Sequence, residues 1–191
     1  IMKALIVLEM AGTVNALKRP LALLEKQDWE LKYAADKVAL SNLTKAGIEC
    51  LTTEVDPNQA IAEFTPDVVL TGISHPSGGI ELGYAVASQD AGIPVAMYRD
   101  YSGISPWVAK ATQHPRATEL LHFLMFDQAT ASAIRRQGWS YNDVQVVGST
   151  YYENLADPEV IKTIKRDRAE LRSKIGVGED DLLIVFNSGA E

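Results

Sequence analysis

Three short runs of apolar residues constrain the possible folds of this sequence more than any other feature. They are ALIVL at residues 4–8, DVVL at 67–70 and LLIVF at 182–186, and none of them alternates with polar residues. A strand that is apolar at successive positions must be covered on both faces, which is typical of parallel sheets flanked by helices. The runs therefore predict an α/β fold with a parallel sheet between two helical layers.

Other strand candidates alternate with helical patterns along the whole chain. The predicted strands are 4–8, 29–34, 48–52, 67–70, 94–98, 122–126, 144–147 and 182–186. The segment WELKY alternates apolar and polar residues, so we place its strand near an edge of the sheet. Asp127 is predicted to cap one helix, and Gly138 to end it in a left-handed conformation.

A helix predicted over residues 158–175 differs from the others. Pro158 suits its first turn, after a capping Asp157. Charged residues, Arg172 among them, occupy most of its surface, which we expect to be solvated, and its narrow apolar stripe comprises Ile161, Ile164, Leu171 and Ile175. Such a helix suits a connector between domains. We therefore expect a domain at 1–156, a linker helix at 157–176, and at 177–191 the first strand of a truncated second domain.

The charge pattern excludes several classes of function. The net charge is -7 with a pI of about 5.0, and no cluster of Lys and Arg is present to bind nucleic acid. The single cysteine, Cys50, permits no internal disulfide, and no metal-ligand spacing is visible. The apolar run near the N-terminus is too short for a signal peptide or a membrane span. We expect a cytoplasmic protein with no metal and no transmembrane segment.

Parallel α/β sheets bind ligands at the carboxyl ends of their strands, where helix N-termini direct backbone N–H groups outward. Three loops follow such ends. The first, EMAGTVNALKRP, matches neither a dinucleotide nor a Walker A pattern. Gly12 permits close approach of a substrate, and Thr13 is predicted to cap the helix and offer a hydroxyl. Pro20 predicts a kink or a late start of that helix. A plain turn and cap is the alternative.

The second loop, TGISHPSGG, contains a candidate general base. His75 lies beside small residues after a strand, and the pKa of histidine near neutrality suits proton transfer. Glu81 falls in the first turn of the following helix. The alternative is a surface histidine that stabilises a turn, and we interpret His114 and His122 as structural. The other substrate-binding candidates of this loop are Ser74, Ser77, Gly78 and Gly79.

The third loop, YRDYSG, begins with two charged residues at the end of a buried strand. Asp100 could act as a base or orient a sugar hydroxyl. Arg99 could bind a phosphate, or pair with Asp100 in a simple ion pair. The sequence leaves these two interpretations open.

Taken in order, six segments resemble the N-terminal domain of GT-B fold proteins over nearly the whole chain. They are KALIVLEMAGTVNALKRPL, TPDVVLTGISHPSGG, GIPVAMYRDYSG, LLHFLMFDQATASAIRRQG, VQVVGSTYYENL and LRSKIGVGEDDLLIVF. The sequence is most similar to UDP-N-acetylglucosamine 2-epimerases, which share the Gly-Thr pair at residues 12–13, and to lipid-A-disaccharide synthase. The resemblance implies a Rossmann-like, acceptor-side domain, a UDP-linked sugar donor, and a carbohydrate or lipid-linked acceptor. Asn187, Ser188 and Gly189 would then begin the loop near the donor phosphates.

Departures from that family direct the choice of reaction. The acidic residue of the epimerases is absent from TGISHPS, and Asp100 replaces a longer glutamate. The resemblance therefore favours a glycosyltransferase that needs no cofactor, in which His75 or Asp100 removes the proton of an acceptor hydroxyl. The 191 residues alone are expected to be inactive. A nucleotide-sugar 2-epimerase-like enzyme and a non-catalytic binding module are the alternatives.

Overall fold

The computed structural model describes residues 1–74, 78–99, 108–140, 143–150 and 158–184. It divides the chain into two compact units, Ile1–Tyr151 and Tyr152–Glu191. The first unit contains β1 (Lys3–Leu8), α1 (Ala11–Lys26), β2 (Glu30–Ala35), α2 (Lys37–Lys45), β3 (Cys50–Leu51), α3 (Pro57–Phe64), β4 (Val68–Gly72), α4 (Gly79–Ala91), β5 (Val95–Arg99), α5 (Val108–Thr112), α6 (Ala117–Leu120), β6 (Leu121–Met125), α7 (Gln128–Arg135) and β7 (Val144–Val146). The second unit contains α9 (Pro158–Lys174).

The strands of the first unit form one seven-stranded sheet in the order β3-β2-β1-β4-β5-β6-β7. Every neighbouring pair is parallel. The predicted α/β fold with a parallel sheet is therefore confirmed. The WELKY segment lies in β2, next to the edge strand β3, close to its predicted place.

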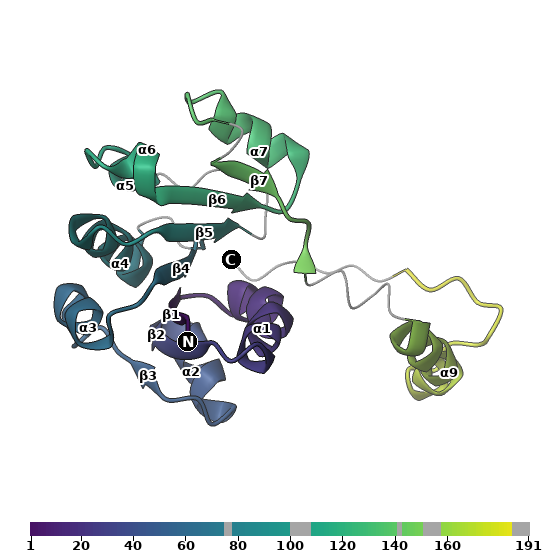
Figure 1. Cartoon of the computed structure of the whole chain (residues 1–191). Helices are drawn as coiled ribbons and strands as arrows, with labels where there is room; N and C mark the ends of the chain where they lie inside the picture. The colour runs from purple at the N-terminus through teal and green to yellow at the C-terminus, as the bar shows by residue number, and fades with distance from the viewer. Residues whose placement is uncertain (75–77, 100–107, 141–142, 151–157, 185–191) are drawn as a thin grey trace. The chain divides into compact units, whose positions relative to one another are not determined.

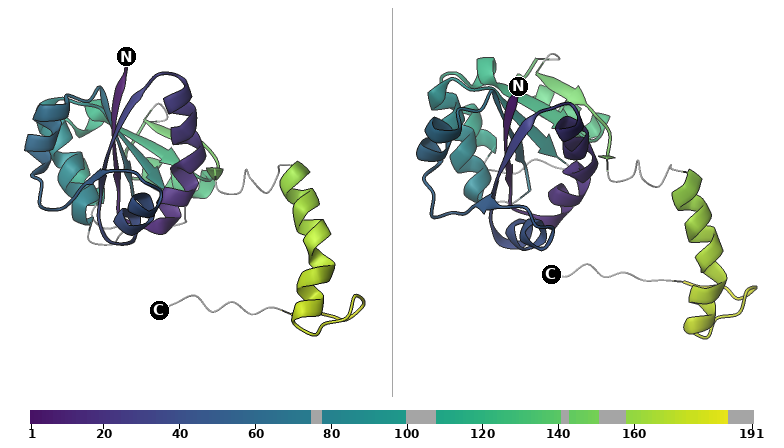
Figure 2. Two further views of the ribbon diagram at one scale, coloured as in Figure 1. Left: turned by 90° about the horizontal axis from the view of Figure 1, so that it is seen from below. Right: turned by 60° about the horizontal axis from the view of Figure 1, so that its bottom comes forward.

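Strand β1 is buried on both faces, as the run ALIVL predicts. Leu5 and Val7 pack with residues of α3 and α4 on one side. Ile6 and Leu8 pack with residues of α1 and α2 on the other. Figure 1 and the left view of Figure 2 show α1 and α3 on opposite sides of this strand. The sheet is thus the middle of three layers.

Two predicted helix ends are confirmed. The side chain of Asp127 accepts a hydrogen bond from the backbone N–H of Thr130 at 2.7 Å, which caps α7. Gly138 has a φ of +98°, so it adopts the left-handed backbone expected after that helix. Both features follow from local chemistry, since an aspartate oxygen satisfies a free helical N–H and glycine tolerates positive φ.

Helix α9 begins at Pro158 as predicted, and its apolar stripe is exposed within its own unit. Ile161 is 38% exposed and Ile175 is 61% exposed. Arg172 corrects the prediction of a solvated charge, because it is only 8% exposed and donates to the carbonyls of Gly178 and Asp181. Residues 182–184 of the predicted eighth strand form no strand, since no described residue of this unit offers a strand to pair with.

Helix α1 runs through Pro20, so the predicted late start of this helix is wrong. Proline has no N–H, and the carbonyl of Ala16 therefore loses its helical donor. The hydroxyl of Thr150 donates to this carbonyl instead. A residue beyond β7 thus replaces the hydrogen bond that the proline removes. None of the described helices has the length and apolar character needed to cross a lipid bilayer.

We expect Thr150→Val to lower the free energy of unfolding by about 1 to 3 kcal/mol, because it leaves the carbonyl of a buried residue without a donor. Urea unfolding would measure the change. In a Pro20→Ala background the loss should shrink, since the restored N–H can donate to Ala16. Thr112→Val is the matched control, because the Thr112 hydroxyl donates to Ala109 at an exposed position. Equal losses for Thr150→Val in both backgrounds would contradict this account.

Candidate functional site

The loops after β1, β4 and β5 lie at one edge of the sheet, as expected for neighbouring parallel strands. The chain proceeds from β1 toward β3 in one direction and from β4 toward β7 in the other. The boundary between β1 and β4 is therefore the topological switch point, where open α/β sheets form a ligand crevice outside the strands' carboxyl ends. The candidate site is this edge of the sheet.

Glu9 directly follows β1 and is fully buried. Its carboxylate forms an ion pair with the ammonium group of Lys37, the first residue of α2. Lys37 has a φ of +50°, a left-handed backbone that is unfavourable for a residue with a side chain. We attribute the persistence of this unfavourable backbone conformation to the ion pair, because surrounding contacts can hold a residue in a strained conformation.

Glu81 supplies a second buried carboxylate at this edge, from the first turn of α4. The backbone N–H of Ser74 donates to it at 3.0 Å, and the Ser74 hydroxyl at 2.5 Å. Burial raises the pKa of Glu81 to about 7, the charge of Glu9 adds to this increase, and the hydrogen bonds oppose it.

Two glycines leave the space that these carboxylates occupy. A Cβ at Gly72 would lie 2.5 Å from one carboxylate oxygen of Glu81 and 3.0 Å from a methyl carbon of Thr13. A Cβ at Gly79 would lie 2.5 Å from a carboxylate oxygen of Glu9. Any larger residue at either position would therefore displace a buried charge.

Arg99, at the end of β5, joins the same cluster. Its guanidinium group is buried and donates to the carbonyl of Ile73 at 3.1 Å. The backbone N–H of Ile73 in turn donates to the carbonyl of Tyr98 at 2.8 Å. Arg99 therefore connects the segment after β4 to the end of β5.

The structure brings several predicted residues to this edge and corrects one of them. Thr13 does not cap α1, because Met10 occupies the capping position. The buried hydroxyl of Thr13 makes no hydrogen bond with the described residues. Gly12 lies beside it in the first turn of α1, and Gly78 precedes α4 with a φ of +82°. The remaining predicted site residues lie outside the described ranges: His75, Ser77, Asp100, Asn187, Ser188 and Gly189.

Sequence reasoning missed Glu9 and Lys37, and it did not assign a role to Glu81. An available signal was the acid in ALIVLE, which directly follows a fully apolar strand. An acidic side chain at the carboxyl end of a central strand lies at a ligand-binding edge by topology alone. The partner Lys37 lies 28 positions away and has no such signal.

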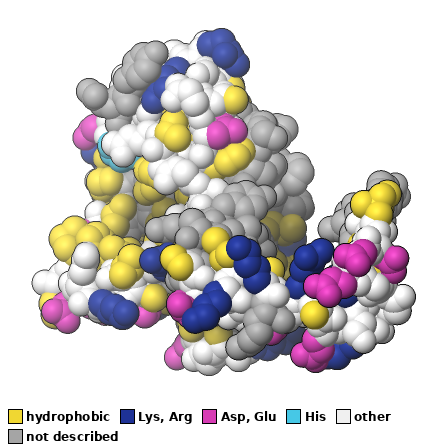
Figure 3. Space-filling model, turned by 90° about the vertical axis from the view of Figure 1, so that its right-hand side faces the viewer, with side chains coloured by type: hydrophobic (Ala, Val, Ile, Leu, Met, Phe, Trp, Pro, Cys, Tyr) yellow, Lys and Arg dark blue, Asp and Glu magenta, His cyan; other side chains and the backbone are white. Residues whose placement is uncertain are grey.

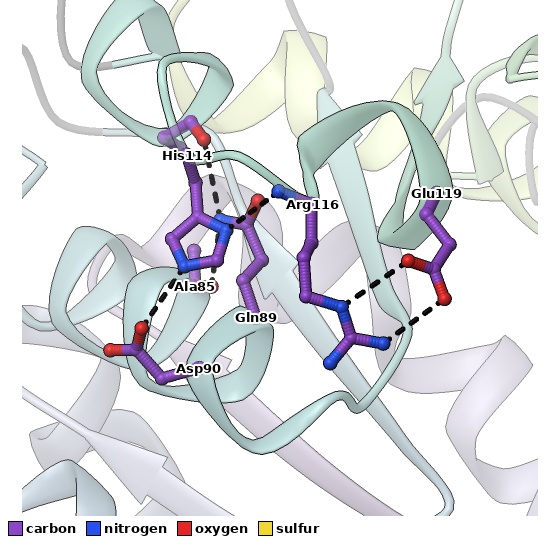
Figure 4. Close-up of polar contacts among 7 residues, drawn as sticks. Ala85, Gln89, Asp90, His114, Arg116 and Glu119 are labelled. Atoms are coloured by element: carbon purple, nitrogen blue, oxygen red, sulfur yellow. Dashed lines mark hydrogen bonds and ion pairs between the residues drawn. The ribbon is translucent and has the colours of Figure 1, made fainter.

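His114 lies at the opposite edge, between α5 and α6, and its contacts fit a structural role. Its Nε2 lies 3.0 Å from a carboxylate oxygen of Asp90, and its Nδ1 accepts the backbone N–H of Arg116 at 3.1 Å. Figure 4 shows these contacts beside the ion pair of Arg116 with Glu119. The cluster joins the end of α4 to the segment before β6.

Other surface features of the first unit do not coincide with the predicted site residues. A cavity of about 510 Å³ between α1 and α2 contains none of the predicted site residues. No group of three or more described His, Cys, Asp or Glu residues is placed to hold a metal ion. On the face drawn in Figure 3, the Lys and Arg side chains of the described residues lie in small separate groups.

Comparison with known proteins identifies the fold. No protein-family model and no curated protein sequence matches the chain. Among solved structures, MnaA of S. aureus in complex with UDP is similar with a TM-score of 0.60 at 16% identity, over 83% of this chain and 48% of that one. UDP-N-acetylglucosamine 2-epimerase from Rickettsia bellii has a TM-score of 0.60 at 13% identity, over 93% and 52%. HepE of Anabaena, in complex with UDP and glucose, has a TM-score of 0.59 at 16% identity, over 92% and 50%.

These structures have the GT-B fold, and the predicted resemblance to it is confirmed at the level of fold. The chain spans about half the length of the solved structures that it matches. The matched part of this chain thus covers about half of each of these structures.

We expect Glu81→Gln to change how stability depends on pH. The folded pKa of about 7 exceeds the ordinary value of 4.5, so this carboxyl stabilises the fold fully below pH 4.5, and the contribution is lost as the pH rises through 7. A shift of this size corresponds to about 3 kcal/mol. Urea unfolding across this pH range should show a decline in the wild type that Glu81→Gln lacks. Glu63→Gln, at an exposed position of α3, should retain the decline. A parallel course for wild type and Glu81→Gln would refute the assignment.

We expect Gly79→Ala to destabilise the protein more than Gly47→Ala does. Both glycines have positive φ, but a Cβ at Gly47 meets nothing within 4 Å, whereas one at Gly79 meets the Glu9 carboxylate. The excess should be about 1 to 3 kcal/mol in urea unfolding, the usual cost of overpacking. Adding Glu9→Ala to Gly79→Ala should reduce it. Equal losses of unfolding free energy in the two single variants would show that the contact with the Glu9 carboxylate does not affect stability.

Proposed function

We propose that the first unit is the acceptor-side domain of a GT-B glycosyltransferase, which moves a sugar from a UDP-linked donor to an acceptor hydroxyl. The observation that carries the proposal is the cluster of buried ionisable groups near the β1–β4 switch point of a GT-B-like domain. Two buried carboxylates, Glu9 and Glu81, and a buried Arg99 lie at the strand ends there. Burial of an ionisable group costs stability. A cluster of such groups in one place is therefore a candidate functional site.

The ligands of the similar structures support a nucleotide-sugar substrate. MnaA is described with UDP, and HepE with UDP and glucose. In our proposal the donor binds to a second domain, whose first loop begins at Asn187, Ser188 and Gly189. The strand-end edge of the first unit then binds the acceptor, a carbohydrate or a lipid-linked saccharide.

In the proposed reaction His75 removes the proton of the acceptor hydroxyl as its oxygen attacks the anomeric carbon. The bond between that carbon and the donor phosphate breaks, and UDP leaves with the bonding electrons. Asp100 is the second candidate base. Glycines 12, 78 and 79 permit close approach of the acceptor, while Thr13, Ser74 and Ser77 offer hydroxyl groups. Glu81 is no candidate for the base, because it is fully buried and Ser74 occupies both of its oxygens.

A second candidate is a nucleotide-sugar 2-epimerase-like enzyme. The likeness to the Rickettsia bellii 2-epimerase over 93% of the chain favours it. That reaction removes a proton from carbon and expels UDP, which requires ionisable groups facing the sugar. Glu9 and Glu81, the described acids beside the β1–β4 boundary, are buried, and their burial favours transfer over epimerisation.

The test is an assay of the natural full-length protein with UDP-sugars, in which UDP release should depend on an added acceptor. We expect His75→Ala or Asp100→Ala to lower kcat by about 100-fold or more, the usual contribution of a general base, with unchanged thermal unfolding. His122→Ala, at an exposed position of β6, is the matched control.

Two results would contradict transfer, and a third would contradict the proposed bases. Conversion of a UDP-sugar without any acceptor would support the epimerase. Binding of UDP-sugar without conversion would support a non-catalytic module. Near-wild-type kcat in both variants would refute the roles of His75 and Asp100.

A further inference from the structure

The cavity between α1 and α2 has the size and the lining of a ligand site. Its volume is about 510 Å³, and it lies on the face of the sheet that these two helices cover. The buried apolar residues of its floor are Leu8, Leu21, Tyr33 and Leu43. Ligand cavities in proteins usually measure about 300 to 1,000 Å³ and are mainly apolar, with a few polar groups that orient the ligand. The floor therefore suits an apolar molecule.

The positions of the lining residues indicate an elongated groove. On α1 they extend from Val14 to Glu25, which corresponds to a length of about 16 Å at the rise of an α-helix. Ala22 of α1 and Ala46, directly after α2, line the groove and are exposed. A larger side chain at either position would occupy part of this space. A long, narrow molecule thus fits the groove better than a compact one.

The charged residues of the lining favour an anion. Lys18 of α1 and Lys45 of α2 line the groove and are both exposed, and we call this part of the groove its mouth. Within the part of the chain that the structure describes, no ion pair involves either lysine. Glu25 is the one acid among the lining residues, so positive charge is in excess there, although the chain has a net charge of -7. A negatively charged group would therefore interact favourably with the mouth.

We propose that this groove binds a single-chain fatty acid, with the hydrocarbon chain along the apolar floor and the carboxylate at the mouth. The hydrocarbon chain supplies the long apolar body, and the carboxylate supplies the negative charge. The side-chain amides of Asn15 and Asn42, which also line the groove, can donate hydrogen bonds to the carboxylate. The proposal is independent of the proposed glycosyl transfer, because none of the lining residues belongs to the acceptor site.

Imperfect packing between two helices is the alternative explanation of the groove. In that case a larger apolar residue at the groove would only fill space and raise stability, and no ligand would be affected. The same substitution should instead prevent binding if the groove holds a hydrocarbon chain. Ala22→Leu separates the two explanations, because leucine is a good helix former and position 22 is exposed, so the variant should fold.

The test is isothermal titration calorimetry of the complete chain with decanoate below its critical micelle concentration. Decanoate should bind at a single site, and Ala22→Leu should lower its affinity by about 10-fold or more, because the added side chain overfills the groove. Ala129→Leu is the matched control, since Ala129 is an exposed alanine of α7 outside the groove and its replacement should leave the affinity unchanged. An equal affinity of Ala22→Leu and wild type, or no binding of decanoate at about 1 mM, would overturn the proposal.

The charge of the head group is tested with decyltrimethylammonium, which has the same hydrocarbon chain and the opposite charge. It should bind about 10-fold more weakly than decanoate. Combining Lys18→Gln with Lys45→Gln should lower the affinity for decanoate by about 3- to 10-fold and reduce this preference. Equal binding of the two amphiphiles to the wild type would contradict the role of the lysines and overturn the assignment of a fatty acid.

Discussion

Burial of β1 on both faces is the constraint on which the rest of the structure depends. Alternate residues of this strand belong to two different apolar clusters, so a single six-residue segment anchors α1 and α2 on one side and α3 and α4 on the other. Because β1 also pairs with both β2 and β4, its carboxyl end coincides with the switch point of the sheet. The same strand that organises the packing therefore determines where Glu9 lies.

The sequence predicted those elements whose stability comes from their own composition. Seven of the strand candidates lie within two residues of the observed strands at both ends, since runs of buried apolar residues leave few alternatives. The predicted Thr13 cap was wrong because α1 already begins at Ala11, with Met10 at its capping position. Prediction also failed where a distant partner decides. Residues 182–184 have no described strand beside them. The ion pair of Glu9 with Lys37 was missed because two loops bring these residues together.

The candidate site concentrates groups that a fold selected only for stability would avoid. Two buried carboxylates, a strained Lys37 and two glycines with no room for a side chain all occur at one edge of the sheet. Each of these features lowers stability, and such local conflicts are expected where function requires a fixed geometry. The Asp90–His114 cluster at the opposite edge is built from an ordinary side-chain hydrogen bond and a backbone contact.

The proline within α1 has a consequence for how the protein is made. The carbonyl that Pro20 leaves without a donor receives one from a residue 134 positions later. During synthesis at about 5 to 20 residues per second, the middle of the first helix therefore waits several seconds or more for its last hydrogen bond. Nearly the whole first unit must leave the ribosome before its earliest helix is complete. The hydrogen bonding of α1 is therefore complete only after Thr150 has been synthesised. In a nascent chain truncated before Thr150, α1 would lack this hydrogen bond.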